Sequence, residues 1–141
     1  MRILGFQKLW PKLTQGWEFT TFRLPRTDKD WQPKEIVQVV LKPRSKQRVM
    51  LGTAEIRAVR PRQFPREITK LPIDHKVPYI TDEEAKIDGF ADVREMYEWM
   101  LKAHGHDDRL MFFPINKLVL RWVTIKTLKG ESDGIQSKDS G

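Results

Sequence analysis

Stretches rich in β-branched residues constrain the fold of this chain more than any other feature. The run 35–41 contains four isoleucine or valine residues and ends before a proline. Alternating patterns of the same character cover 49–59 and 111–125, and shorter ones cover 2–6 and 17–23. Branched side chains fit the pleated surface of a strand better than the wall of a helix. The chain is therefore predicted to be β-rich, with a bulge or bend at Gly52.

Two helices are predicted in the second half of the chain. Thr81 and Glu84 form a capping box, which predicts a short helix over 82–87 that ends at the next glycine. Asp92 precedes a longer amphipathic segment that ends at Gly105. Because so few helices separate the strands, we expect an α+β fold. Its mixed or antiparallel sheet would curl into a small β-barrel with two or three flanking helices.

Length and composition suit one domain. With 141 residues, 39% of them hydrophobic, we expect a single domain over 1–126 and a flexible polar tail over 127–141. The chain has no apolar run of roughly 18 residues and no leader-like start, so we expect it to be neither membrane-spanning nor secreted. The absence of cysteine fits a cytoplasmic protein. The three histidines lack ligand spacing, so no metal and no cofactor are expected.

The positive charge is concentrated in one stretch. Residues 42–70 hold nine lysines and arginines against two glutamates, which accounts for the whole net charge of +7. Prolines at 61, 65, 72 and 78 predict a long irregular connection within and beyond this stretch. Phosphate groups are bound by such surfaces, although an acidic protein partner would suit the same stretch. The candidate phosphate-binding residues lie at a turn and in this connection: Arg44, Lys46, Arg48, Arg60, Arg62 and Arg66.

Tryptophan can stack on nucleic-acid bases. Of the five tryptophans, Trp31 lies among polar and charged residues, so we expect it to be exposed and to contact a ligand. Trp99 and Trp122 are assigned to the core.

Three segments resemble one known family: GWEFTTFR at 16–23, VVLKPRS at 39–45 and ITDEEAKIDGF at 80–90. Together they resemble an ASCH domain, over roughly residues 3–125. The resemblance implies a PUA-like β-barrel and an association with RNA. In some bacterial members it implies hydrolysis of acetylated cytidine or cleavage of RNA.

The signature of that family falls on Gly16, Thr21 and Arg23, whereas its lysine position holds Glu18. The resemblance also places Asp88 where the amidohydrolase members have a catalytic carboxylate. Alternation along a strand would direct Thr21 and Arg23 into the same cleft.

We therefore expect binding of RNA or of a modified nucleotide through a cleft beside the basic stretch. Hydrolysis of acetylated cytidine or RNA is the alternative, with Thr21, Glu18 and Asp88 as its catalytic candidates. The loss of the lysine favours binding over catalysis. The third alternative is an adaptor for an acidic protein.

Overall fold

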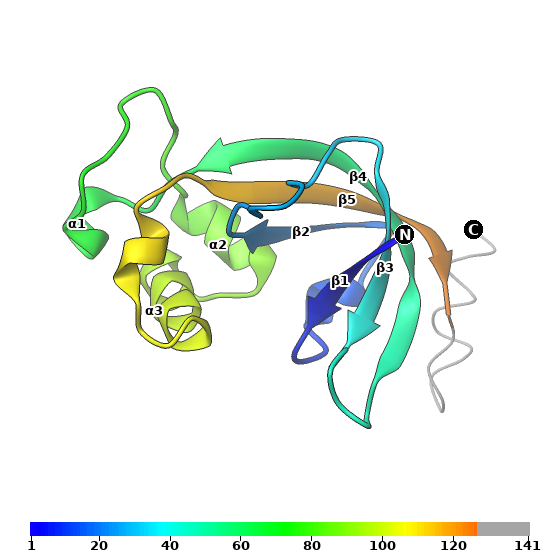
Figure 1. Ribbon diagram of the computed structural model, residues 1–141. Coiled ribbons are helices and arrows are strands. Elements are labelled where there is room, and N and C mark those ends of the chain that lie inside the picture. The colour runs from blue at the N-terminus through cyan, green and yellow to red at the C-terminus, as the bar shows by residue number, and fades with distance from the viewer. Residues whose placement is uncertain (127–141) are drawn as a thin grey trace. The chain divides into compact units, whose positions relative to one another are not determined.

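The computed structural model describes residues 1–126, so the tail predicted over 127–141 lies outside the described residues. The described chain has an α+β fold with a five-stranded sheet in the order β1-β3-β4-β5-β2 (Figure 1). The strands are β1 (Arg2–Phe6), β2 (Glu18–Arg23), β3 (Ile36–Leu41), β4 (Val49–Arg62) and β5 (Ile115–Ile125). The helices are α1 (Arg66–Thr69), α2 (Asp82–Asp88) and α3 (Val93–Ala103), with short 3-10 turns η1 (Pro11–Leu13) and η2 (Asp108–Met111).

The described residues fall into two compact units. The first unit is built from Met1–Phe19, Gln32–Ala58 and the chain from Val119 onward, and the second from Thr20–Trp31 and Val59–Leu118. Strands β2, β4 and β5 each contribute residues to both units.

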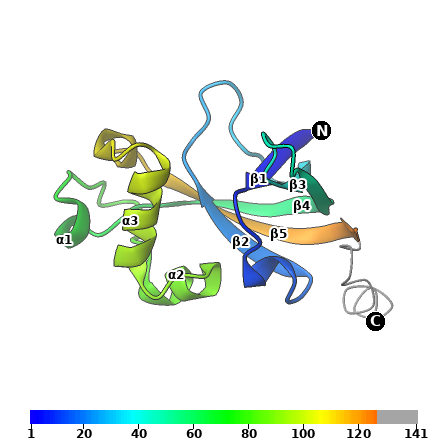
Figure 2. The same cartoon turned by 90° about the horizontal axis from the view of Figure 1, so that it is seen from below.

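The core of the first unit forms around β1, β3 and the first part of β4. Strand β1 pairs in parallel with β3, and β3 pairs antiparallel with β4. Figure 2 shows these three strands together. Phe19 packs edge-on against Phe6 at a centroid distance of 6.3 Å, and its ring is tilted by 40° against that of Trp122 at 5.1 Å. Aromatic contacts of this kind add to the burial of apolar area, which is the main stabilising contribution.

Gly52 marks a close approach between β4 and β5 in the first unit. Its φ is +151°, and a Cβ at this position would lie 2.1 Å from the carbonyl oxygen of Thr124. The register of β3 and β4 shifts where Val39 faces Gly52 and Val40 faces Met50. The predicted bulge at Gly52 is therefore confirmed, and only glycine fits there.

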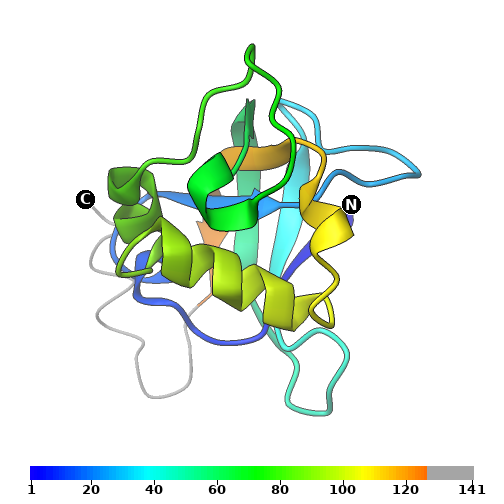
Figure 3. The same ribbon diagram turned by 90° about the vertical axis from the view of Figure 1, so that its left-hand side faces the viewer.

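The second unit contains all three helices. The capping box is present: the Thr81 hydroxyl accepts from the Glu84 N–H, and the Glu84 carboxylate accepts from the Thr81 N–H. The predicted start of the longer helix at Asp92 is also confirmed: Asp92 is the N-cap of α3, and its carboxylate accepts from the Glu95 N–H. Helices α2 and α3 contact one another and are drawn in green and yellow-green in Figure 3.

The connection predicted to be irregular from Pro61 is more ordered than expected. Strand β4 runs on through Pro61 to Arg62, and Gln63 bridges to Tyr79. The buried Gln63 amide donates to the carbonyl oxygens of Asp74 at 2.6 Å and Val77 at 2.7 Å, and accepts from the Asp74 N–H at 3.0 Å. The Gln63 side chain thus holds both ends of the turn 74–77 in place.

The last strand also differs from the prediction. It begins at Ile115 rather than at Met111, because Asp108–Met111 forms the 3-10 turn η2 ahead of Pro114. The Asp107 carboxylate caps this turn by accepting from the Arg109 N–H.

Candidate nucleic-acid interface

The charge of the described residues divides between the two units. The described part of the first unit contains eleven lysines and arginines and three glutamates, a net charge of +8. The second unit contains thirteen basic and thirteen acidic residues, a net charge of zero. The fold therefore divides the positively charged stretch 42–70. Its first half belongs to a strongly basic unit, and its second half belongs to a unit with no net charge.

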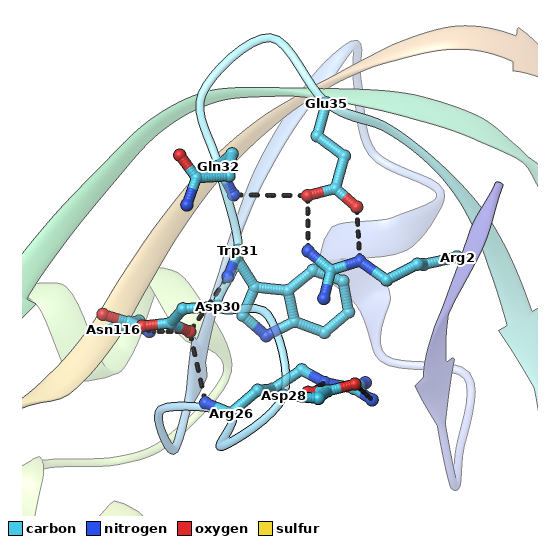
Figure 4. A network of polar contacts seen from close by, with 8 residues as sticks. All are labelled: Arg2, Arg26, Asp28, Asp30, Trp31, Gln32, Glu35 and Asn116. Carbon is cyan, nitrogen blue, oxygen red and sulfur yellow. Dashed lines mark hydrogen bonds and ion pairs between the residues drawn. The ribbon is translucent and has the colours of Figure 1, made fainter.

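Two of the three glutamates in the first unit are already used in ion pairs. Glu35 accepts two hydrogen bonds from the Arg2 guanidinium, both at 2.6 Å, and also one from the Gln32 N–H at 3.2 Å (Figure 4). Glu55 pairs with Arg57 at 3.0 Å. These pairs leave nine cations against one carboxylate in the described part of this unit.

The densest group of cations lies on the loop between β3 and β4, residues 42–48, which we call the basic loop. It carries four cations in seven residues and no carboxylate. The teal connection between β3 and β4 in Figure 1 is this loop. The predicted phosphate-binding residues Arg44, Lys46 and Arg48 are all exposed on it.

Internal hydrogen bonds shape the basic loop. Lys42 has a φ of +48°, and its carbonyl accepts from the Ser45 N–H at 3.1 Å. The Ser45 hydroxyl then accepts from the Gln47 N–H at 2.9 Å, and the Lys42 ammonium donates to the Gln47 side chain at 3.0 Å. Arg44 and Lys46 make no hydrogen bond or ion pair with the described residues, so their full charge faces solvent.

Arg62, one of the predicted phosphate-binding residues, is held in a cluster with Glu84 and Lys117. Its Nε lies 3.1 Å from the Glu84 carboxylate, and Lys117 Nζ lies 2.6 Å from the same oxygen. All three side chains are largely buried: Arg62 is 17% exposed, Glu84 is 14% exposed and Lys117 is 16% exposed. A partly buried arginine held in this way is a structural group, whereas Arg60 and Arg66 are exposed in the second unit.

The electrostatics of Glu84 follow from these contacts. Burial alone would raise the pKa of its carboxyl group. Hydrogen bonds from Lys117, from the Thr81 N–H and from Arg62 outweigh burial and lower the pKa below its ordinary value.

The residues of the family signature meet within the second unit. Arg23 Nε donates to the Thr21 hydroxyl at 3.2 Å, and the charge of Asp88 acts on the Arg23 guanidinium. The Thr20 hydroxyl donates to Asp88 Oδ1 at 3.1 Å. Thr21, Arg23 and Asp88 are therefore neighbours, as the sequence led us to expect. Thr20, which sequence reasoning missed, is the hydroxyl that contacts the carboxylate.

The pKa of Arg23 is lowered to about 10, because burial disfavours its charge more than Asp88 favours it. The group is still protonated at neutral pH. Asp88 is 4% exposed and is the last residue of α2, where the negative end of the helix dipole disfavours a carboxylate. Arg23 and Thr20 offset that cost, so the cluster also works as a link between β2 and α2.

The remaining signature residues, Gly16 and Glu18, belong to the first unit. Glu18 is exposed and belongs to the first unit, whereas Thr21 and Asp88 belong to the second. Gly16 has a φ of +144° and no atom within 4 Å of a built Cβ, so its backbone conformation, and not close packing, requires glycine.

Trp31 is buried, which corrects the prediction that it is exposed. It is 5% exposed, and the Arg26 guanidinium lies 5.4 Å from the centre of its ring. The neighbouring Asp30 carboxylate accepts from the Asn116 amide at 2.8 and 3.0 Å and from the Trp31 N–H at 2.9 Å (Figure 4). A ring held in this way cannot stack on a base. Trp99, which was assigned to the core, is instead 40% exposed.

Comparison with known proteins gives no relative. No family model matches the chain, and neither a curated protein nor a solved structure matches it. Within residues 1–126, no group of three histidine or acidic side chains could hold a metal ion. No helix in the same part of the chain has the length and apolar character needed to cross a membrane.

Proposed function

We propose that this protein binds RNA, or a ligand with nucleotide-like phosphates, through the basic loop of its first unit. The observation that carries the proposal is the division of charge: +8 on the described part of one unit and zero on the other. Exposed cations without nearby carboxylates attract phosphates, since each phosphate contact releases a condensed counterion.

The resemblance to ASCH domains supports RNA as the ligand over an acidic protein. Because ASCH domains have a PUA-like fold, we also propose that the five-stranded sheet of this protein forms a PUA-like barrel. The α+β architecture and the mixed sheet are compatible with that assignment.

Binding can be measured by fluorescence anisotropy with a labelled 20-nucleotide RNA. The test variant replaces Arg44, Lys46 and Arg48 by glutamine. Losing three phosphate contacts should weaken the binding of single-stranded RNA about 100-fold at roughly 0.1 M salt.

The matched control replaces three exposed cations of the second unit, Arg60, Arg66 and Lys76, by glutamine, with the same change in charge. It should bind nearly as well as the wild type. Equal weakening in both variants would show that only net charge matters and would refute a role for the basic loop. Absence of binding of the labelled RNA to the wild type would favour an acidic protein as the partner.

The second candidate function is hydrolysis of an acetylated cytidine or of RNA, and it is favoured by the meeting of Thr21, Arg23 and Asp88. A threonine nucleophile needs a base that takes its proton. Asp88 contacts Thr20, and Thr21 accepts a hydrogen bond from Arg23, so no base contacts Thr21 among the described residues. This arrangement ranks catalysis below binding.

Hydrolysis has its own test. Acetate release from acetylated cytidine, followed by mass spectrometry, should be absent for the wild type. Release that disappears in Thr21→Ala and in Asp88→Asn would place the hydrolase first.

A further inference from the structure

The basic unit has cations on its surface but no exposed aromatic ring. Its described part contains five aromatic residues, and the segment Gln32–Ala58, which carries the basic loop, contains none. Trp17 is half-buried and the other four are buried: Phe6, Trp10, Phe19 and Trp122. Proteins that hold single strands by their bases use exposed rings as stacking platforms. This unit presents no such platform in its described residues.

The basic loop also offers few groups that could read the edge of a base. Its backbone N–H groups at Ser45, Gln47 and Arg48 are already used within the turn. The Gln47 side-chain oxygen accepts from Lys42. Groups without a partner among the described residues include the charged ends of Arg44 and Lys46, which suit phosphate oxygens, and the Gln47 side-chain NH2, which is a neutral donor. Arginine can also pair with the edge of guanine, so guanine is the base that has to be tested.

We infer that the protein recognises the phosphodiester backbone and not the bases, so that it binds nucleic acid of any sequence, in duplex as well as in single-stranded form. This inference rests on the proposed function and specifies its ligand. The four cations of the basic loop set the size of the effect. Four phosphate contacts give a slope of log K against log salt of about −2.8 for a single strand and about −3.6 for B-form DNA. Between 50 and 200 mM salt, affinity should fall about 50-fold for a single strand and about 150-fold for duplex DNA.

The experiment compares labelled 20-nucleotide ligands by anisotropy at several salt concentrations. The set contains uridine-only, adenine-only and guanine-containing RNA, together with duplex RNA and duplex DNA of mixed sequence. The single strands should agree within about threefold at equal salt, both duplexes should bind, and the slopes should match the values above. Lys46→Gln should reduce the single-strand slope by about 0.7, the contribution of one phosphate contact.

The outcomes separate this inference from the function on which it rests. A preference above about tenfold for one base composition, or failure to bind either duplex, would overturn the inference while leaving RNA binding in place. Absence of binding to every ligand at 50 mM salt would overturn both. The second unit has exposed aromatic residues, so Trp99→Ala and Phe113→Ala serve as controls. Their affinities should equal that of the wild type, and a tenfold loss in either would show that bases stack on the protein.

Discussion

Glu84 joins two cations and a helix cap, and its replacement by glutamine should destabilise the protein strongly. Its carboxylate contacts Arg62 at 3.1 Å, Lys117 at 2.6 Å and the Thr81 N–H at 3.1 Å. Glutamine keeps the oxygen that accepts from Thr81, so the cap survives and only the ion pairs are lost. Removing one partner of a buried ion pair costs about 3–5 kcal/mol, and the residual exposure of these side chains places this case near the lower end, about 3 kcal/mol.

The assay is urea unfolding followed by circular dichroism, with Glu83→Gln as the control. Glu83 lies in the same helical turn, carries the same charge and is exposed. A loss of about 3 kcal/mol corresponds to a decrease in melting temperature of roughly 10 °C for a protein of this size. Equal unfolding free energies for Glu84→Gln and Glu83→Gln, within about 0.5 kcal/mol, would refute the role of the ion pairs.

The same pair of variants gives a pH dependence with a definite sign. The pKa of Glu84 is lowered in the folded protein, so its contribution is present above the unfolded pKa, near 4.3, and is lost as pH falls through the lower folded pKa. The difference in stability between the wild type and Glu84→Gln should therefore be constant at neutral pH and shrink in acid. A difference that stays the same below pH 3 would contradict the assigned contacts.

Two further predictions concern the backbone and one loop. Gly52→Ala should prevent stable folding, because its Cβ would lie 2.1 Å from the Thr124 carbonyl oxygen, whereas Gly16→Ala should cost only about 1–3 kcal/mol of backbone strain. Similar yields and melting temperatures for the two variants would contradict the close approach. Asp30→Ala removes the carboxylate that fastens residues 26–31 and should speed tryptic cleavage after Lys29, as measured by mass spectrometry of the fragments. An unchanged cleavage rate would show that this loop is held by other contacts.

The elements predicted correctly are those with a local signal. The capping box at Thr81 and Glu84 and the N-cap at Asp92 each lie within four residues of the group they satisfy. The β-branched run 35–41 likewise carries its strand signal within its own residues, and it forms β3. The extension of β4 through Pro61 was missed because a strand in the middle of a sheet depends on pairing with distant segments, and no local pattern marks that pairing.

The candidate site was predicted in part, and its errors have a common cause. Thr21, Arg23 and Asp88 were expected together and are neighbours in the second unit. Exposure was judged from neighbours in the sequence, and this failed where a distant partner decides it. Trp31 has polar neighbours along the chain, yet it is buried beside an aspartate that bonds to a residue 86 positions away.

The distribution of positive charge, like the exposure of Trp31, depends on residues that are distant in the sequence. A window along the chain found the excess in residues 42–70, but the fold combines three separate segments into the basic unit. The second half of the window contributes to a unit in which acids balance it. Arg62 illustrates the consequence, because its charge is matched by Glu84, which lies 22 residues further on.

Binding by the basic loop is tested most directly by NMR, from the changes in backbone amide resonances on addition of a short uridine-only RNA. The largest shifts should fall on residues 42–48, weaken with salt, and leave residues 104–113 of the second unit unchanged. Shifts confined to the second unit, with residues 42–48 unaffected at saturating RNA, would contradict binding by the basic loop.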